Sequence, residues 1–194
     1  MHIRLTVAAA AILATLGTAE AAPITFTTTL GPEVAGAAGS GTATVVIDTV
    51  ANTLAISFSF SGLSGLTTVA HIHCCTAVPG VGIVGVAVTP GTFPGFVVGV
   101  QAGSYSNTFD TADGSTYAAG FVTNFGGGTF DGAEAALLSG LFAGSAYLNV
   151  HSTAFPSGEI RGFLGVPEPA SLALLGIGLA GLAGLGRRRL PTAA

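Results

Sequence analysis

The chain has 194 residues, of which 49% are hydrophobic and 7% charged, and its formal net charge at pH 7 is −4. Residues 22–165 hold no lysine and a single arginine, Arg161, against seven acidic residues. Without a basic patch, this part of the chain is not expected to bind nucleic acid or anionic lipid. It is also too apolar to stay unfolded and long enough to bury one core, which indicates a single domain.

The N-terminus has the three parts of a secretory signal peptide. The basic start MHIR precedes the apolar run LTVAAAAILATL, and Ala19 and Ala21 form an A-x-A pattern. The apolar run is too short to span a bilayer. We predict a signal peptide over residues 1–21 that is cut after Ala21, since a later cut would place Pro23 beside the cleaved bond. An uncleaved anchor is the alternative.

Residues 22–165 have the pattern of an all-β domain. β-branched and aromatic runs bounded by Gly, Pro, Asn or Ser predict strands at ITFTTTL, LTTVAHIH, VGIVGVAV, GFVVGV, SAYLNVHS and GEIRGFL. TATVVIDTVANTLAISFSF predicts a hairpin that turns at DTVAN. DGAEAALLSGLFAGS predicts one short helix, with Asp131 as N-cap and Glu134 three residues later. The expected fold is an antiparallel Greek-key β-sandwich or barrel with one short helix.

Three histidines are the first candidate site. His71 and His73 lie in AHIHCCTAVPG, and His151 lies in AYLNVHSTAFPSGEIRGFL. Side chains two apart on a strand share a face, so His71 and His73 point the same way. The three imidazoles could form a copper or zinc site, with copper preferred, or they could be packed, hydrogen-bonded side chains. On either interpretation we expect them to lie close together.

Cys74 and Cys75 directly follow the H-x-H strand and are the chain's two cysteines. A pair of cysteines in an exported protein usually forms a disulfide. Adjacent residues hold their Cα atoms about 3.8 Å apart, shorter than the usual disulfide range. We expect a vicinal disulfide that shapes the turn. Free thiols, an intermolecular bridge and thiolates that support a metal are the alternatives.

Glu159 and Arg161 share a face of the last predicted strand. Arg161 is the only cation of residues 22–165, and Glu159 is the nearest acid in the sequence. Because buried charges must be paired, we predict a structural ion pair between them.

Two motifs carry a family resemblance over about residues 41–165. SGL…TTVAHIH is followed some way on by LFAGSAYLNVHSTAFPSGEIRGFL, and this order resembles the chordin-type (CHRD) domain. Its marks are a Gly-Leu turn, an A-H-I-H strand, an aromatic-x-N-x-H strand and a P-x-G-E-I-R-G end. The resemblance implies an extracellular module that also occurs in bacterial surface proteins.

A weaker resemblance connects the chain to the copper–zinc superoxide dismutases. Those are β-sandwiches in which an H-x-H strand and a later V-H strand supply copper ligands. The resemblance would make the three histidines metal ligands and Arg161 the guiding arginine. The mature chain has no fourth histidine to bridge to zinc and lacks the His and Asp pattern of the zinc loop. Dismutase activity is therefore not expected.

The C-terminal part, residues 166–190, begins VPEPASLALLG and ends in an arginine cluster. We predict a transmembrane helix over residues 170–186, which would reach about 25 Å, just short of a typical hydrocarbon core. Clustered arginines favour the cytoplasmic side, which would leave the body outside. The motif residues are Pro167, Glu168, Pro169, Arg187, Arg188 and Arg189.

This tail resembles the PEP-CTERM sorting signal of Gram-negative bacteria. The resemblance implies recognition by an exosortase-type enzyme, removal of the helix near Pro167–Pro169, and transfer through the periplasm to the cell surface or an exopolysaccharide matrix. A plain transmembrane anchor in the inner membrane is the alternative.

Together these features predict an exported surface or matrix protein, processed by an exosortase-type system, with a non-catalytic structural or adhesive domain. Exopolysaccharide and other surface proteins are the expected partners, and no cofactor is required. The alternative is a small copper- or zinc-binding redox or storage protein that uses His71, His73 and His151.

Overall fold

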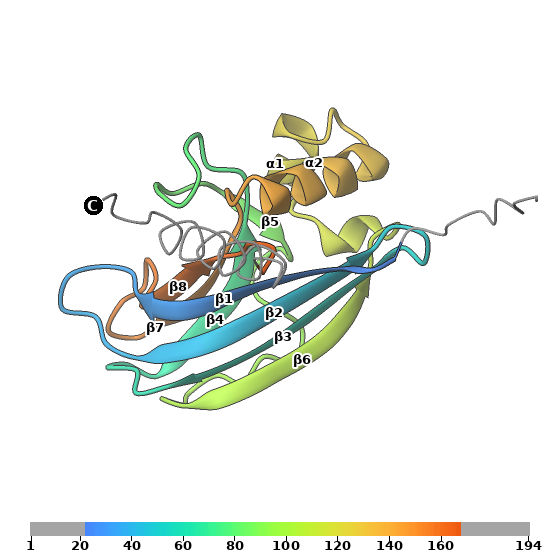
Figure 1. Ribbon diagram of the computed structural model, residues 1–194. Helices are drawn as coiled ribbons and strands as arrows, with labels where there is room; N and C mark the ends of the chain where they lie inside the picture. Colours follow the sequence, from blue (N-terminus) through green and yellow to red (C-terminus); the bar gives the residue numbers. More distant parts are fainter. Residues whose placement is uncertain (1–21, 168–194) are drawn as a thin grey trace, which may run out of the picture.

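The computed structural model describes residues 22–167 (Figure 1). Its elements, in chain order, are β1 (Ile24–Pro32), β2 (Ser40–Asp48), β3 (Thr53–Ser61), β4 (Thr67–His73), β5 (Val86–Val88), β6 (Gly103–Asp110), the 3-10 turn η1 (Gly114–Thr116), α1 (Ala119–Asn124), α2 (Phe130–Phe142), β7 (Tyr147–Ser152) and β8 (Ile160–Phe163).

The strands form one antiparallel sheet in the order β5-β4-β7-β8-β1-β2-β3-β6. The sheet curls into an open half-barrel, with both helices on one side of it (Figure 1). The prediction of an antiparallel β fold is confirmed in its coarser form, since the domain is mostly β with few helices. The prediction of a two-sheet sandwich or closed barrel is not, because the edge strands β5 and β6 do not pair. Helix α2 and the segment 89–102 supply core side chains instead of a second sheet.

The predicted hairpin at DTVAN is confirmed by the pairing of β2 with β3 from Ser40↔Ser61 to Asp48↔Thr53. The Asp48 carboxylate accepts the N–H groups of Val50 and Ala51, and Asn52 takes a φ of 53°. Strict alternation then buries one face of both strands. The buried side chains are Ala43, Val45, Ile47, Leu54, Ile56, Phe58 and Phe60.

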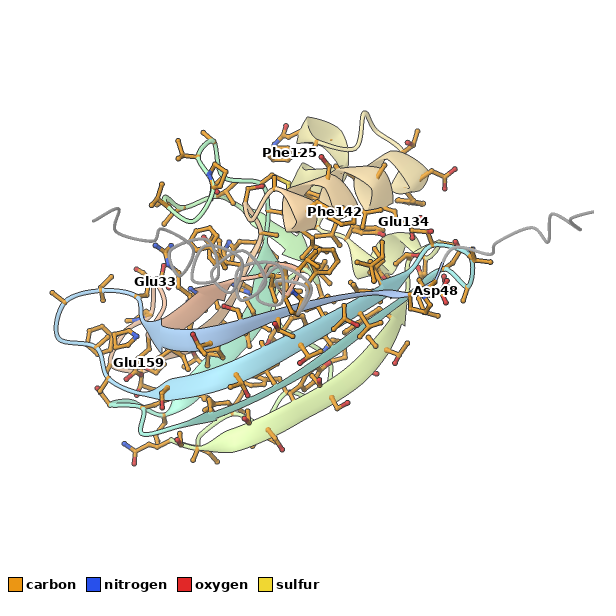
Figure 2. All side chains as sticks on the ribbon, in the orientation of Figure 1. Glu33, Asp48, Phe125, Glu134, Phe142 and Glu159 are labelled. Carbon is orange, nitrogen blue, oxygen red and sulfur yellow. A yellow bond between two sulfur atoms is a disulfide. The ribbon has the colours of Figure 1, made fainter. Side chains whose placement is uncertain are left out.

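Helix α2 closes part of the concave side of the sheet. Leu137 and Leu141 are fully buried. The ring of Phe142 packs edge-on against that of Phe26 on β1, with 5.3 Å between the ring centroids (Figure 2). The N-cap is Thr129, whose hydroxyl accepts the N–H of Gly132, and Asp131 lies in the first turn. The predicted Asp131 cap was therefore two residues late, and α1 was not predicted.

The predicted strand GFVVGV, residues 95–100, is a loop. Gly95 and Gly99 both take positive φ values, which an extended strand does not allow. Phe96 in this loop and Phe93 just before it pack against the ring of Phe58 on β3. In VGIVGVAV only the last three residues form a strand, β5.

The predicted signal peptide, residues 1–21, and the predicted helix 170–186 lie outside the described residues, as do Glu168, Pro169 and the arginine cluster. Within residues 22–167, no helix has the length and apolar character needed to cross a membrane.

Candidate functional site

Strands β4 and β7 bring the three histidines together on the outer face of the sheet. On β4, Ala70 and Ile72 are fully buried in the core, so His71 and His73 project to the opposite face. Antiparallel pairing sets His71 opposite Asn149, and His151 lies two residues further along β7 on the same face. We call His71, His73 and His151 the histidine cluster.

The rings of the cluster are in direct contact. Nε2 of His71 lies 3.0 Å from Nε2 of His151, and the His71 ring centroid lies 4.5 Å from that of His73. One ring nitrogen from each of the three residues lies within 4.8 Å of the others. His71 and His151 are 6% and 8% exposed, and Nε2 of His73 is buried without a hydrogen-bond partner.

Backbone carbonyls fix the tautomers of all three rings. Nδ1 of His71 lies 3.3 Å from the Gly91 oxygen, Nδ1 of His73 lies 2.6 Å from that of Val84, and Nδ1 of His151 lies 2.8 Å from that of Pro156. A carbonyl oxygen only accepts, so each Nδ1 carries the donated hydrogen. In its neutral form each ring therefore presents a bare Nε2, and the Nε2 atoms of His71 and His151 face each other.

Burial keeps the two rings on β4 neutral. Burial, together with the neighbouring His73 and His151, lowers the pKa of His71 to about 4, and the hydrogen bond to the Gly91 carbonyl opposes this shift only in part. Burial also lowers the pKa of His73. Imidazoles whose Nδ1 is held by a carbonyl, with one ring nitrogen of each within 4.8 Å of the others, are an arrangement in which histidines can bind metals.

An ion pair borders the cluster. Arg161 on β8 lies beside Asn149, its guanidinium pairs with the Glu33 carboxylate at 3.3 Å, and it also donates to the carbonyl of Gly82. Arg161 lies 5.1 Å from the centre of the Tyr147 ring, which stacks on His73. The Glu33 carboxylate also accepts a hydrogen bond from the Asn149 amide. Burial raises the pKa of Glu33, and Arg161, His151 and Asn149 partly offset that rise.

The predicted ion pair between Glu159 and Arg161 is not formed. The Glu159 side chain is fully buried and accepts the backbone N–H groups of Ser64 and Gly65. Both acids lie at the same end of the sheet, but Glu33 is the one that pairs with Arg161, whereas Glu159 holds the turn before β4. Figure 2 shows Glu33 and Glu159 at this end and Asp48 at the other.

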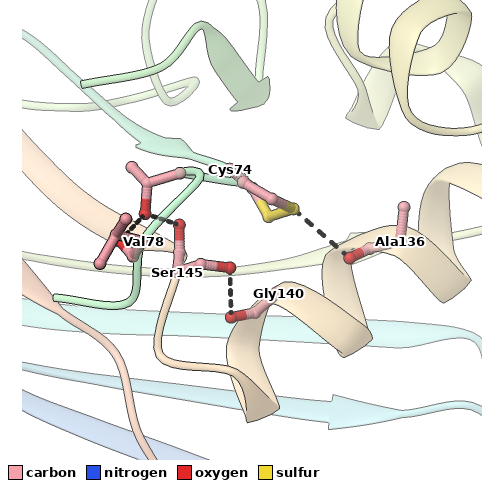
Figure 3. The surroundings of a disulfide bond; sticks show 7 residues. Cys74, Val78, Ala136, Gly140 and Ser145 are labelled. Carbon is pink, nitrogen blue, oxygen red and sulfur yellow. Dashed lines mark hydrogen bonds between the residues drawn. A yellow bond between two sulfur atoms is a disulfide. The ribbon is translucent and has the colours of Figure 1, made fainter. Parts of the chain in front are cut away.

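Cys74 and Cys75 are joined by a disulfide. Figure 3 shows it against α2, where Sγ of Cys75 lies 3.6 Å from the carbonyl oxygen of Ala136. Gly140 gives the disulfide its space, because a Cβ on this residue would overlap both sulfur atoms. Cys74 belongs to the core cluster, on the side of the sheet away from the histidines. The disulfide therefore shapes the β4–α2 contact and supplies no thiolate to the histidine cluster.

Strands β1, β2, β3 and β6 carry a second feature, a regular array of hydroxyls on their outer face. Two complete rows of paired residues cross the four strands, and neighbouring hydroxyls are set by the strand spacing of about 4.8 Å. The rows are Thr27–Thr44–Ser57–Ser106 and Thr29–Thr42–Ser59–Ser104. We call these eight residues the hydroxyl face. All of them are exposed except Thr44, which is partly exposed, and two shallow grooves of about 460 and 360 Å³ run over the array.

Several residues of the site were not predicted from the sequence. Glu33 is 128 positions from Arg161 in the sequence, and no local pattern links the two residues. The sequence showed only that residues 22–165 hold one cation and seven acidic residues, any of which was a possible partner. The carbonyls of Val84 and Gly91 come from loops that no motif marks, and Pro156, although it begins the P-x-G-E-I-R-G motif, was not predicted to contact a histidine. Asn149 could have been found, because it shares a strand face with His151.

Comparison with known families assigns both parts of the chain. A model of the CHRD domain matches residues 14–164, and a model of the PEP-CTERM protein-sorting motif matches residues 165–189. No curated protein and no solved structure matches the chain. The sorting motif implies export and a surface or extracellular location. Since the first match spans most of the chain and includes both histidine strands, this protein belongs to the CHRD domain family.

Proposed function

We propose that this protein is a surface or matrix protein released by an exosortase-type enzyme, and that its CHRD domain is a non-catalytic adhesive module. The observation that carries the proposal is the order of the two matches, with the PEP-CTERM motif at 165–189 directly after the CHRD domain. An exopolysaccharide matrix is the setting in which such a module would act.

The hydroxyl face supports an adhesive role. It bears eight alcohol side chains and no charge, and the nearest acids in register, Asp48 and Asp110, lie at its far end. Alcohols both donate and accept hydrogen bonds, as sugar hydroxyls do. Neutral polysaccharide is therefore the chemistry that fits this face, held by many weak contacts.

Binding of the purified protein to exopolysaccharide from its own cells tests this role. The double variant Ser57→Glu/Ser59→Glu places two charges in the centre of the face and should lose retention on immobilised polysaccharide. Ala119→Glu/Thr123→Glu on exposed positions of α1 adds the same charge elsewhere and should be retained like the wild type. Equal retention of both variants would refute adhesion through the hydroxyl face.

A second candidate function, metal-ion binding at the histidine cluster, is favoured by one specific observation. The Nε2 atoms of His71 and His151 face each other at 3.0 Å, and the carbonyl contacts of the two Nδ1 atoms leave both Nε2 atoms as acceptors in the neutral rings. Two lone pairs at this distance repel unless a proton or a metal ion lies between them. Titration of the purified protein with copper and zinc tests this function, and His151→Gln should abolish binding. An unchanged affinity in that variant would exclude the cluster as the site.

A further inference from the structure

We infer that the histidine cluster selects a monovalent, soft cation, copper(I), over zinc(II) and copper(II). This inference rests on the second proposed function and concerns the identity of the ion. Three properties of the cluster carry it: the charge of its donors, their number, and their enclosure.

The donor set carries no charge. The described residues place three His side chains together, with no carboxylate or thiolate in the group. The two sulfur atoms are in a disulfide on the other side of the sheet, so they cannot add negative charge. The cluster therefore offers three neutral nitrogens.

The Glu33 carboxylate at the border of the cluster is already neutralised. Glu33 pairs with Arg161 and accepts from the Asn149 amide, so this border of the cluster has no net charge. The charge of a bound ion would remain uncompensated in a buried site. The cost of burying an ion rises steeply with its charge, which penalises a divalent cation far more than a monovalent one.

The number of donors points the same way. Zinc(II) takes four ligands in structural sites, and an open zinc site adds water to three protein ligands. Here Nε2 of His73 has no contact with solvent, and His71 and His151 are nearly buried. Loops that include Val84, Gly91 and Pro156 hold the outer edges of the rings. A closed set of three imidazoles satisfies copper(I), which accepts three-coordination, and leaves zinc(II) or copper(II) one ligand short.

The test compares ions on the full chain, purified with its disulfide oxidised. Copper(I) is delivered without oxygen in competition with a copper(I) chelator, silver(I) serves as its air-stable substitute, and zinc(II) and copper(II) are titrated in parallel. We expect one copper(I) or silver(I) per chain, bound about 100-fold or more tightly than zinc(II), a difference of about 2.7 kcal/mol. X-ray absorption of the bound copper should show three imidazole nitrogens and no sulfur.

Three variants keep the result interpretable. His73→Gln and His151→Gln should each lose the ion, and Cys74→Ser/Cys75→Ser should keep it. If one histidine variant fails to fold, the other variant and the absorption spectrum still decide. Zinc(II) or copper(II) bound as tightly as copper(I) through the same histidines would overturn this inference while metal binding stands. Failure of every ion to bind would remove the second proposed function itself.

Discussion

Glu159 holds the turn between β3 and β4 with a buried carboxylate. The side chain is fully buried and accepts two backbone N–H groups, from Ser64 and Gly65. Burial alone would raise its pKa, but hydrogen bonds from Ser152, Ser64 and Gly65 outweigh burial and hold the pKa of Glu159 below its ordinary value. The ionised form is therefore the one that stabilises the fold.

We predict that Glu159→Gln lowers the free energy of unfolding by about 1–3 kcal/mol at neutral pH, because the amide accepts with one oxygen only. A depressed carboxyl pKa contributes stability above the ordinary value near 4.5 and loses it as the pH falls through the folded pKa. The difference in the free energy of unfolding between the variant and the wild type should therefore become smaller at acidic pH. Urea unfolding at neutral and acidic pH measures it.

Glu134→Gln is the matched control, since Glu134 accepts a single hydroxyl, from Thr111, at 2.7 Å. A Gln oxygen can accept the same bond, so this change should cost less than about 0.5 kcal/mol. Equal losses in the two variants would show that the Glu159 charge has no special role.

The sequence was enough to predict that His71 and His73 share a face, because side chains alternate between the two faces of a strand and this depends only on neighbouring residues. It did not predict the partner of Arg161. Glu33 and Glu159 reach the same end of the sheet, and only the pairing of β1 with β8 decides which carboxylate meets the guanidinium. Long-range register is a property of the whole sheet, and no single stretch of sequence carries it.

Among the elements, helix α2 can pack against the disulfide that follows β4 only because residue 140 is a glycine. A Cβ there would overlap the sulfur atoms of Cys74 and Cys75. We predict that Gly140→Ala costs about 1–3 kcal/mol, the range for overpacking a buried contact. The comparison is Gly120→Ala on α1, where a Cβ meets nothing within 4 Å. That change should be neutral or stabilise by up to about 1 kcal/mol, since alanine favours helix.

Thermal unfolding of both glycine variants measures the difference. If Gly140→Ala melts with or above the wild type, then α2 does not pack on the disulfide as the structure has it. A loss in Gly120→Ala as large as that in Gly140→Ala would attribute the effect to helix glycines in general.

Strands in which apolar and polar residues alternate regularly were predicted from the sequence, whereas elements shaped by contacts with distant residues were not. The β2–β3 hairpin has clean alternation and a capped turn. Strand β6 is an edge strand rich in Ser, Asn and Thr, so its sequence GSYSNTFD lacks the apolar density that marks a strand. The loop at residues 95–100 has that density, but Gly95 and Gly99 bend it, and neighbouring Phe93 and Phe96 bury in the core.

At the scale of the whole molecule, the domain and its tail serve different purposes. The domain carries the hydroxyl face and the histidine cluster, and the PEP-CTERM motif directs the chain to the surface. Replacing Pro167, Glu168 and Pro169 with alanine removes the Pro-Glu-Pro residues of the motif that implies recognition by the processing enzyme. We predict that this variant stays with the inner membrane, whereas the control Pro191→Ala, beyond the arginines, is released normally. Immunoblots of membrane and surface fractions distinguish the two, and release of the triple variant would contradict the role of the motif.

The most direct test of processing at the surface is the intact mass of the protein released from its native cells. We predict one main species that begins near residue 22 and ends near Pro167–Pro169, without the apolar segment 170–186. A surface species whose mass includes residues 170–186 would contradict it.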